Sequence, residues 1–185
     1  MNKNIDMQKL LDGILLLDNE ELRTLLVFIV GFPGENVDTL RETADMINLL
    51  GSNNGFLQYH IYGLYMSPLS TLSEKSVRQR WGINGIGFIW SHNTMKSSSL
   101  TKCIRELFMN IDTMTYAYET ESYYYLKQFS SQERLQLIRT RNDLAKEIMR
   151  KASYKERLTK LQKIISLLKV TNLTIGKDLV EKLTI

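Results

Sequence analysis

The stretch that decides the fold is Leu25-Leu26-Val27-Phe28-Ile29-Val30-Gly31-Phe32-Pro33-Gly34-Glu35. Its first six residues are all apolar, and they end in a Gly-x-Pro-Gly turn. Apolar residues then recur at helical spacing: Val37, Leu40, Ala44 and Ile47. A short apolar run, a turn and an amphipathic helix are typical of one unit of a parallel α/β sheet. Because ligands bind beyond the carboxyl ends of strands in such sheets, the turn is the first candidate site.

The flanking sequence predicts further elements on both sides of this unit. Residues 6–20 predict a helix before the first strand, and Asn36 is expected to cap the helix after it. Residues 56–62 are rich in aromatic and β-branched types and predict a second strand, parallel to the first. Further helices are predicted over 98–111, 132–150 and 154–169. The expected fold class is therefore α/β, with a mostly helical C-terminal region.

Composition excludes several classes of protein. A chain of 185 residues with 43% hydrophobic content can form one ordinary core. The single cysteine rules out an internal disulfide framework and favours a reducing compartment. Two histidines and one cysteine are too few for a closed zinc site, so no metal site is expected. With no signal-peptide pattern and no apolar run of spanning length, we expect a cytoplasmic protein with no membrane partner.

The basic residues concentrate at the C-terminal end. Residues 131–185 hold 13 Lys/Arg and 6 Asp/Glu, whereas the rest of the chain holds 11 and 14. The charges alternate in sign along helical repeats, which is typical of solvated helix faces. The alternative is a non-enzymatic helical interaction module whose basic tail binds an acidic partner or RNA. No RRM or KH motif is visible, so nucleic acid is not the expected partner.

The strand, turn and helix at 25–50 closely resemble the penultimate strand unit of the radical S-adenosylmethionine (SAM) barrel. The resemblance is to the branch that often carries a cobalamin-binding domain upstream. It implies that the end of the strand and the turn lie beside the adenine of SAM, which makes the candidate cofactor contacts Ile29, Gly31, Pro33, Gly34 and Glu35. Two positions depart from the family pattern: Val27 replaces a glycine of the general motif, and Asn36 replaces a threonine.

The second strand predicts a polar face beside this site. Gln58, His60 and Tyr62 alternate along it and are expected to line the barrel lumen as substrate-facing residues. His60 is either a general base or, more commonly for such a residue, a hydrogen-bonded structural histidine. The segment 65–72 resembles the proline-containing segment that follows the last strand of the family barrel.

A third motif is Trp90-Ser91-His92-Asn93-Thr94-Met95, which resembles runs in the cobalamin-type relatives. His92 is the substrate-facing candidate in it, while Ser91 and Thr94 can equally be turn and cap residues. No residue is assigned a catalytic role. Cys103 is expected inside a helix as a small apolar filler, because one thiol cannot hold an iron–sulfur cluster.

The resemblance also predicts the organisation of the chain. Residues 1–72 would be the C-terminal part of a partial (β/α)6 radical SAM barrel, contributing its last two parallel strands. Residues 73–130 would be a cap on the substrate side, and 131–185 a helical C-terminal extension. Glu21 stands where relatives tend to have the glycine that ends a helix, and its loss would cost about 1 kcal/mol.

What is absent defines the expected function. Full-length relatives use SAM, a [4Fe–4S] cluster and, in this branch, often cobalamin, and they hold the cluster with a Cys-x3-Cys-x2-Cys segment. This sequence has no such segment. We therefore expect a fragment of a radical SAM enzyme that holds no cofactor alone and is not catalytic alone. It is a truncated reading frame, a split subunit, or an independently stable protein whose C-terminal helices cover the missing part of the barrel. For a split subunit, an upstream polypeptide would supply the missing barrel strands. The substrate and the oligomeric state are left open.

Overall fold

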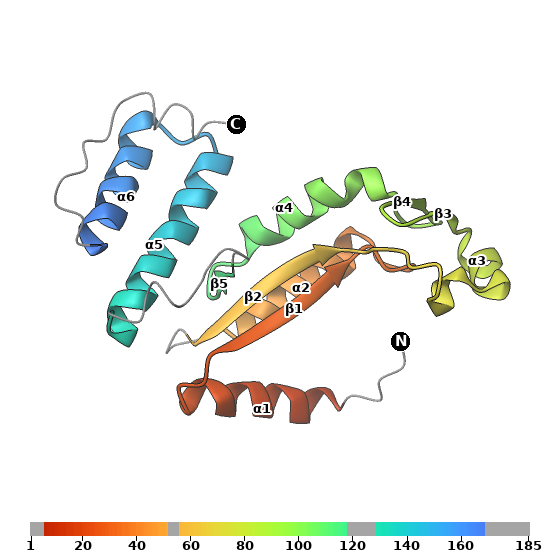
Figure 1. The fold of residues 1–185 in the computed structure, drawn as a ribbon, viewed down its shortest axis with the longest axis horizontal. Coiled ribbons are helices and arrows are strands. Elements are labelled where there is room, and N and C mark those ends of the chain that lie inside the picture. The colour runs from red at the N-terminus through yellow and green to blue at the C-terminus, as the bar shows by residue number, and fades with distance from the viewer. Residues whose placement is uncertain (1–5, 52–55, 118–128, 169–185) are drawn as a thin grey trace. The chain divides into compact units, whose positions relative to one another are not determined.

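The computed structural model describes residues 6–51, 56–117 and 129–168. The chain forms two compact units, Met1–Ala117 and Tyr118–Ile185, which are described one at a time. No helix among the described residues is long and apolar enough to cross a membrane. The fold is mixed α/β, with a small parallel sheet in the first unit and a mostly helical C-terminal region (Figure 1).

The first unit contains the predicted βαβ arrangement. Its helices and strands, in chain order, are α1 (Met7–Asn19), β1 (Thr24–Val30), α2 (Val37–Leu49), β2 (Leu57–Gly63), α3 (Lys75–Trp81), β3 (Asn84–Ile86), β4 (Ile89–Ser91), α4 (Leu100–Asn110) and β5 (Thr115–Tyr116), with 3-10 turns η1 (Thr71–Ser73) and η2 (Ser97–Ser99). β1 and β2 are parallel neighbours, which confirms the prediction from the sequence. The short strand β5, which the sequence did not predict, also pairs parallel to β2, so the strand order is β1-β2-β5.

The sheet has one covered face and one open face. On the covered face, Leu57, Tyr59 and Ile61 of β2 are buried together with side chains of α2 and α4. These helix residues are Leu40, Ala44, Ile47, Leu107 and Phe108. On the other face, alternate residues of β1 remain 42–53% exposed: Leu25, Val27 and Ile29. β1 carries apolar side chains on both faces, but only the side chains of one face are covered.

The segment after Pro68, whose sequence shows no clear helical or strand periodicity, contains an antiparallel hairpin. β3 and β4 pair from Asn84↔Ser91 to Ile86↔Ile89, where the sequence predicted only a short apolar piece. Gly87 lies at the hairpin turn with a φ of 65°, a left-handed conformation that side chains disfavour. The preceding helix α3 ends at Gly82, which is also left-handed.

The second unit contains two helices that contact each other, α5 (Ser131–Met149) and α6 (Tyr154–Leu167). Both predicted helices are confirmed to within two residues at each end. Each starts with a capping box, in which Ser130 pairs with Glu133 and Ser153 with Glu156. The hydrogen bonds from the Ser153 side chain and backbone lower the pKa of the Glu156 carboxyl.

The end of α1 yields a first prediction. Glu21 has a φ of 56°, and hydrogen bonds from its N–H to Asp18 and from Leu22 N–H to Leu17 form a Schellman motif. Glu21→Gly should raise the free energy of unfolding by about 1 kcal/mol, because glycine adopts this conformation without a Cβ clash. Urea unfolding measures the change. Glu20→Gly is the control, since Glu20 has a φ of −81° and should gain nothing. Equal effects of both substitutions would contradict the assignment.

Candidate functional site

The predicted turn at the carboxyl end of β1 closes on itself through Glu35. One carboxylate oxygen of Glu35, Oε2, accepts hydrogen bonds from the backbone N–H groups of Gly31, at 2.5 Å, and Phe32, at 3.2 Å. Gly31 and Gly34 have φ values of 112° and 102°, so both positions require glycine. The turn is therefore held in one conformation by a charged acceptor within it.

The Trp90–Met95 motif folds back onto this turn from about 60 residues away. His92 Nε2 donates to the carbonyl oxygen of Gly31 at 3.0 Å, and Thr94 Oγ1 accepts from Gly34 N–H at 3.1 Å. The ring of Trp90 stacks on that of His92, with centroids 5.1 Å apart and planes 7° apart. Two motifs that the sequence presented separately thus form a single assembly. We call Gly31, Glu35, Trp90, His92 and Thr94 the Gly31 cluster.

Protein groups occupy both ring nitrogens of His92. The side chain is buried, and its Nδ1 accepts from the N–H groups of Thr94, at 3.3 Å, and Met95, at 3.2 Å. Because Nε2 faces the Gly31 carbonyl, the Nε2–H tautomer of a neutral ring fits every neighbour. This geometry suits a residue that positions the turn, and it leaves no ring nitrogen directed at a substrate.

The predicted polar face of β2 lies on the open side of the sheet. The strand register pairs Gln58 with Leu25, His60 with Val27 and Tyr62 with Ile29, so these side chains share one face. Gln58 and His60 are buried, whereas Tyr62 is exposed. The sheet thus brings the candidate cofactor contact Ile29 next to the candidate substrate-facing residue Tyr62.

His60 is held by the segment that contains β5. Its Nδ1–H donates to the carbonyl oxygen of Ala117 at 2.7 Å, and Tyr116 Oη donates to its Nε2 at 3.4 Å. The His60 ring also contacts the ring of Tyr62, with centroids 4.2 Å apart. Of the two interpretations of His60, the geometry matches the hydrogen-bonded structural histidine.

Of the cofactors that the resemblance implies, the residues present suit the adenine of SAM and do not suit an iron–sulfur cluster. Ile29 and Tyr62 are each 42% exposed, and together they form an apolar and aromatic surface suited to a flat adenine ring. Gly31 offers no free backbone group, since its N–H binds Glu35 and its C=O binds His92. Pro33 and Gly34 are half-buried in the turn. An iron–sulfur cluster does not fit, because the chain has one thiol and the described residues contain no metal-binding group of three His, Cys, Asp or Glu.

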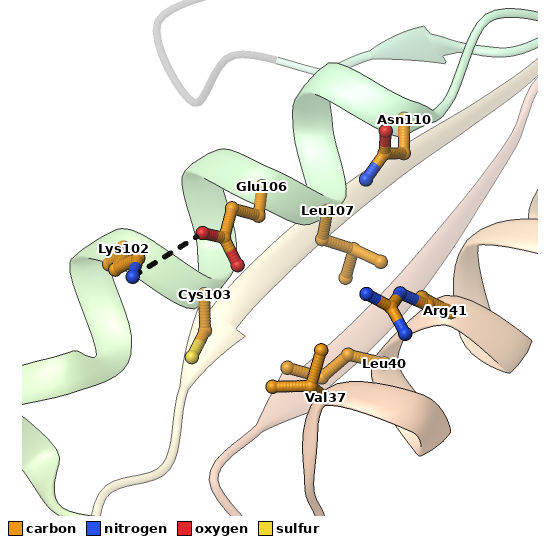
Figure 2. Close-up of a pocket in the computed structure, with 8 residues that line it drawn as sticks. All are labelled: Val37, Leu40, Arg41, Lys102, Cys103, Glu106, Leu107 and Asn110. Carbon is orange, nitrogen blue, oxygen red and sulfur yellow. Dashed lines mark ion pairs between the residues drawn. The ribbon is translucent and has the colours of Figure 1, made fainter.

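A groove between α2 and α4 was not predicted from the sequence. Two adjoining pockets of about 340 and 490 Å³ lie along it, and the second is also lined by His92 and the segment that follows it to Ser99. Figure 2 shows Lys102, Cys103 and Glu106 of α4 facing Val37 and Arg41 of α2. Lys102 and Glu106 form an ion pair at 3.8 Å, and Cys103 is half-buried. Helical periodicity identifies which side of each helix is buried, but it does not reveal a gap where the two helices meet.

Sequence reasoning missed the residues that join distant segments. Trp90 lies against Gly31 and donates from Nε1 to the carbonyl oxygen of Leu64 at 2.9 Å. The sequence predicts a turn or cap role for Thr94, and the structure shows that its hydroxyl also accepts a hydrogen bond from Gly34 N–H, 60 positions away. The sequence gives one weak signal for the contact between Trp90 and Gly31, because a large ring can pack closely against a residue that has no Cβ.

Comparison with protein-family models, with curated proteins and with solved structures found no match to this chain.

Proposed function

We propose that this chain is the C-terminal part of a radical SAM enzyme, where it forms the adenine side of the cofactor site and part of the substrate-facing wall. The main support is the position of Ile29 and Tyr62, which lie side by side and exposed at the carboxyl end of a parallel pair. Ligands of α/β sheets bind at this end. The glycine-containing turn that the resemblance places beside adenine follows Ile29 directly.

The open edge of β1 supports the proposal that an upstream polypeptide completes the sheet. Within the described residues β1 pairs with β2 alone, and its seven residues contain no charge. Natural edge strands are usually shielded by charges, proline or bulges. α1 adds further exposed apolar side chains: Met7, Leu10, Leu15, Leu16 and Leu17. A strand paired to β1 and a layer over the open face would bury these side chains.

The proposed roles follow from these positions. In the family, bound SAM and cluster together supply the radical chemistry. Here Ile29 and Tyr62 would hold the adenine ring by apolar contact, and the Gly31 cluster would fix the strand end that presents them. His60 would orient the Tyr62 ring. Without cluster ligands of its own, the chain would bind SAM weakly and would catalyse nothing alone.

Titration with S-adenosylhomocysteine, an unreactive analogue of SAM, tests the adenine contact. We expect weak binding, with a Kd of roughly 1 mM, because only one side of the site is present. NMR should show shifts of the Ile29 methyl and Tyr62 ring signals. Ile29→Asp should weaken binding at least about tenfold, since it places a charge against the base.

Leu25→Asp is the matched control for this titration. Leu25 lies on the same face of β1 and is similarly exposed, but at the opposite end of the strand from the turn. It should leave the affinity unchanged. Equal losses in the two variants, or shifts that avoid Ile29 and Tyr62, would contradict the adenine contact. A [4Fe–4S] absorbance from the isolated chain after incubation with iron and sulfide would contradict the incomplete-enzyme proposal.

A further inference from the structure

The β3–β4 hairpin presents an exposed apolar tip. Phe88 and Ile89 are 69% and 83% exposed, and Ile86 is 52% exposed. Tyr65, in the segment after β2, is 53% exposed and its ring contacts that of Phe88. Large apolar side chains gathered on one exposed feature mark an interaction surface more often than scattered ones do. We call Tyr65, Ile86, Phe88 and Ile89 the hairpin tip.

The hairpin tip is held in place by backbone and ring contacts. Met66 and Gly87 exchange two backbone hydrogen bonds, at 2.8 and 2.9 Å. The rings of Tyr65 and Phe88 meet edge to face, with centroids 4.8 Å apart. Arg78 of α3 donates from Nη2 to the carbonyl oxygen of Gly85 at 3.1 Å. The apolar side chains are therefore displayed on a braced turn.

The sequence around the hairpin tip is mostly basic. Residues 63–101 contain one acidic residue, Glu74, and four basic residues: Lys75, Arg78, Arg80 and Lys96. Three of them belong to α3, which Arg78 links to the hairpin, and Lys96 forms a β-bridge with Ser91 of β4. Cations around an apolar protrusion complement a surface that is anionic outside and apolar beneath.

We propose that the hairpin tip inserts into the surface of an anionic lipid bilayer, with the cations of α3 and Lys96 at the headgroups. Ile86 and Ile89 of the tip are exposed aliphatic side chains, which suit acyl chains and do not stack on RNA bases. Tyr65 and Phe88 are the tip residues able to stack on bases, and their rings pack edge to face on each other. The exposed apolar side chains of α1 do not fit an anionic surface. Residues 6–23 hold five acidic and two basic residues, so anionic lipid repels them. A surface contact needs no spanning helix, so the proposal departs from the expectation of no membrane partner, which is based on the lack of a spanning run and of a signal-peptide pattern.

Co-sedimentation of the full chain with vesicles tests the proposal. The chain should pellet with vesicles of phosphatidylcholine and phosphatidylglycerol, and not with phosphatidylcholine alone. Phe88→Ser with Ile89→Ser should lower the partition coefficient roughly 100-fold, from the lost apolar burial. Lys75→Gln and Lys96→Gln should each lower it about fivefold, and added salt should act in the same direction.

Leu15→Ser with Leu16→Ser is the control, because it removes two exposed apolar side chains, at 45% and 58% exposure, from α1. It should leave the partition coefficient unchanged, and circular dichroism should show that every variant is folded. Failure to pellet with anionic vesicles would overturn the proposal, as would equal losses in the hairpin and α1 variants. Binding of a single-stranded oligonucleotide that the hairpin substitutions abolish, without vesicle binding, would point to RNA and overturn it too. None of these outcomes depends on SAM binding.

Discussion

Gly31→Ala should lower the free energy of unfolding by about 3 kcal/mol, because the new methyl group meets both a backbone constraint and a close neighbour. The φ of Gly31 is 112°, where L side chains are strained. A Cβ there would lie 2.7 Å from Cη2 and 2.8 Å from Cζ2 of Trp90. Trp90 cannot withdraw easily, because its Nε1–H binds Leu64 and its ring stacks on His92. The expected loss is therefore large for a single methyl group.

Gly13→Ala is the control for this substitution. Gly13 lies inside α1, and a Cβ there would meet no atom within 4 Å. Alanine at this position should raise the free energy of unfolding by roughly 0.5–1 kcal/mol, as expected for a helix interior. Urea unfolding of both variants gives the comparison. A Gly31→Ala protein as stable as the parent would show that the turn and Trp90 are not in close contact.

The elements with strong local patterns could be predicted from the sequence. β1 is a short apolar run that ends in turn residues, and β2 is rich in aromatic and β-branched residues. The α5 and α6 helices carry clear periodicity and Ser-x-x-Glu starts. The hairpin could not be predicted, because β3 and β4 have three residues each and Gly85 and Gly87 look like loop residues. β5 has two residues and depends on pairing with β2, about 57 positions earlier.

The candidate site divides in the same way. Glu35 lies four residues from Gly31, and the Gly-x-Pro-Gly pattern marks the whole turn, so local sequence identified it. The contact between this turn and His92 depends on the path of the chain after β4. Hydrophobic periodicity does not predict that path. Tyr116 and Ala117 hold His60 through the same kind of long-range contact. Sequence reasoning therefore found the parts of the site, and the structure was needed to join them.

His92→Phe should lower the free energy of unfolding by about 3 kcal/mol, because it removes a donor and an acceptor while keeping a ring against Trp90. The Gly31 carbonyl would lose its donor, and the N–H groups of Thr94 and Met95 would lose their acceptor. Each buried group left unsatisfied costs about 1–3 kcal/mol. Urea unfolding measures the loss, and Asn93→Ala, an exposed neighbour, should change stability by less than about 0.5 kcal/mol.

Combining His92→Phe with Gly31→Ala distinguishes a positioning residue from a substrate-facing one. If His92 holds the Gly31 turn, both substitutions release the same turn, so the double variant should lose less than the two single losses combined. The shortfall should be about 1 kcal/mol or more, since contacting residues couple by roughly 0.5–3 kcal/mol. Additive losses would separate His92 from the turn. A His92→Phe protein as stable as the parent would contradict the positioning role of His92.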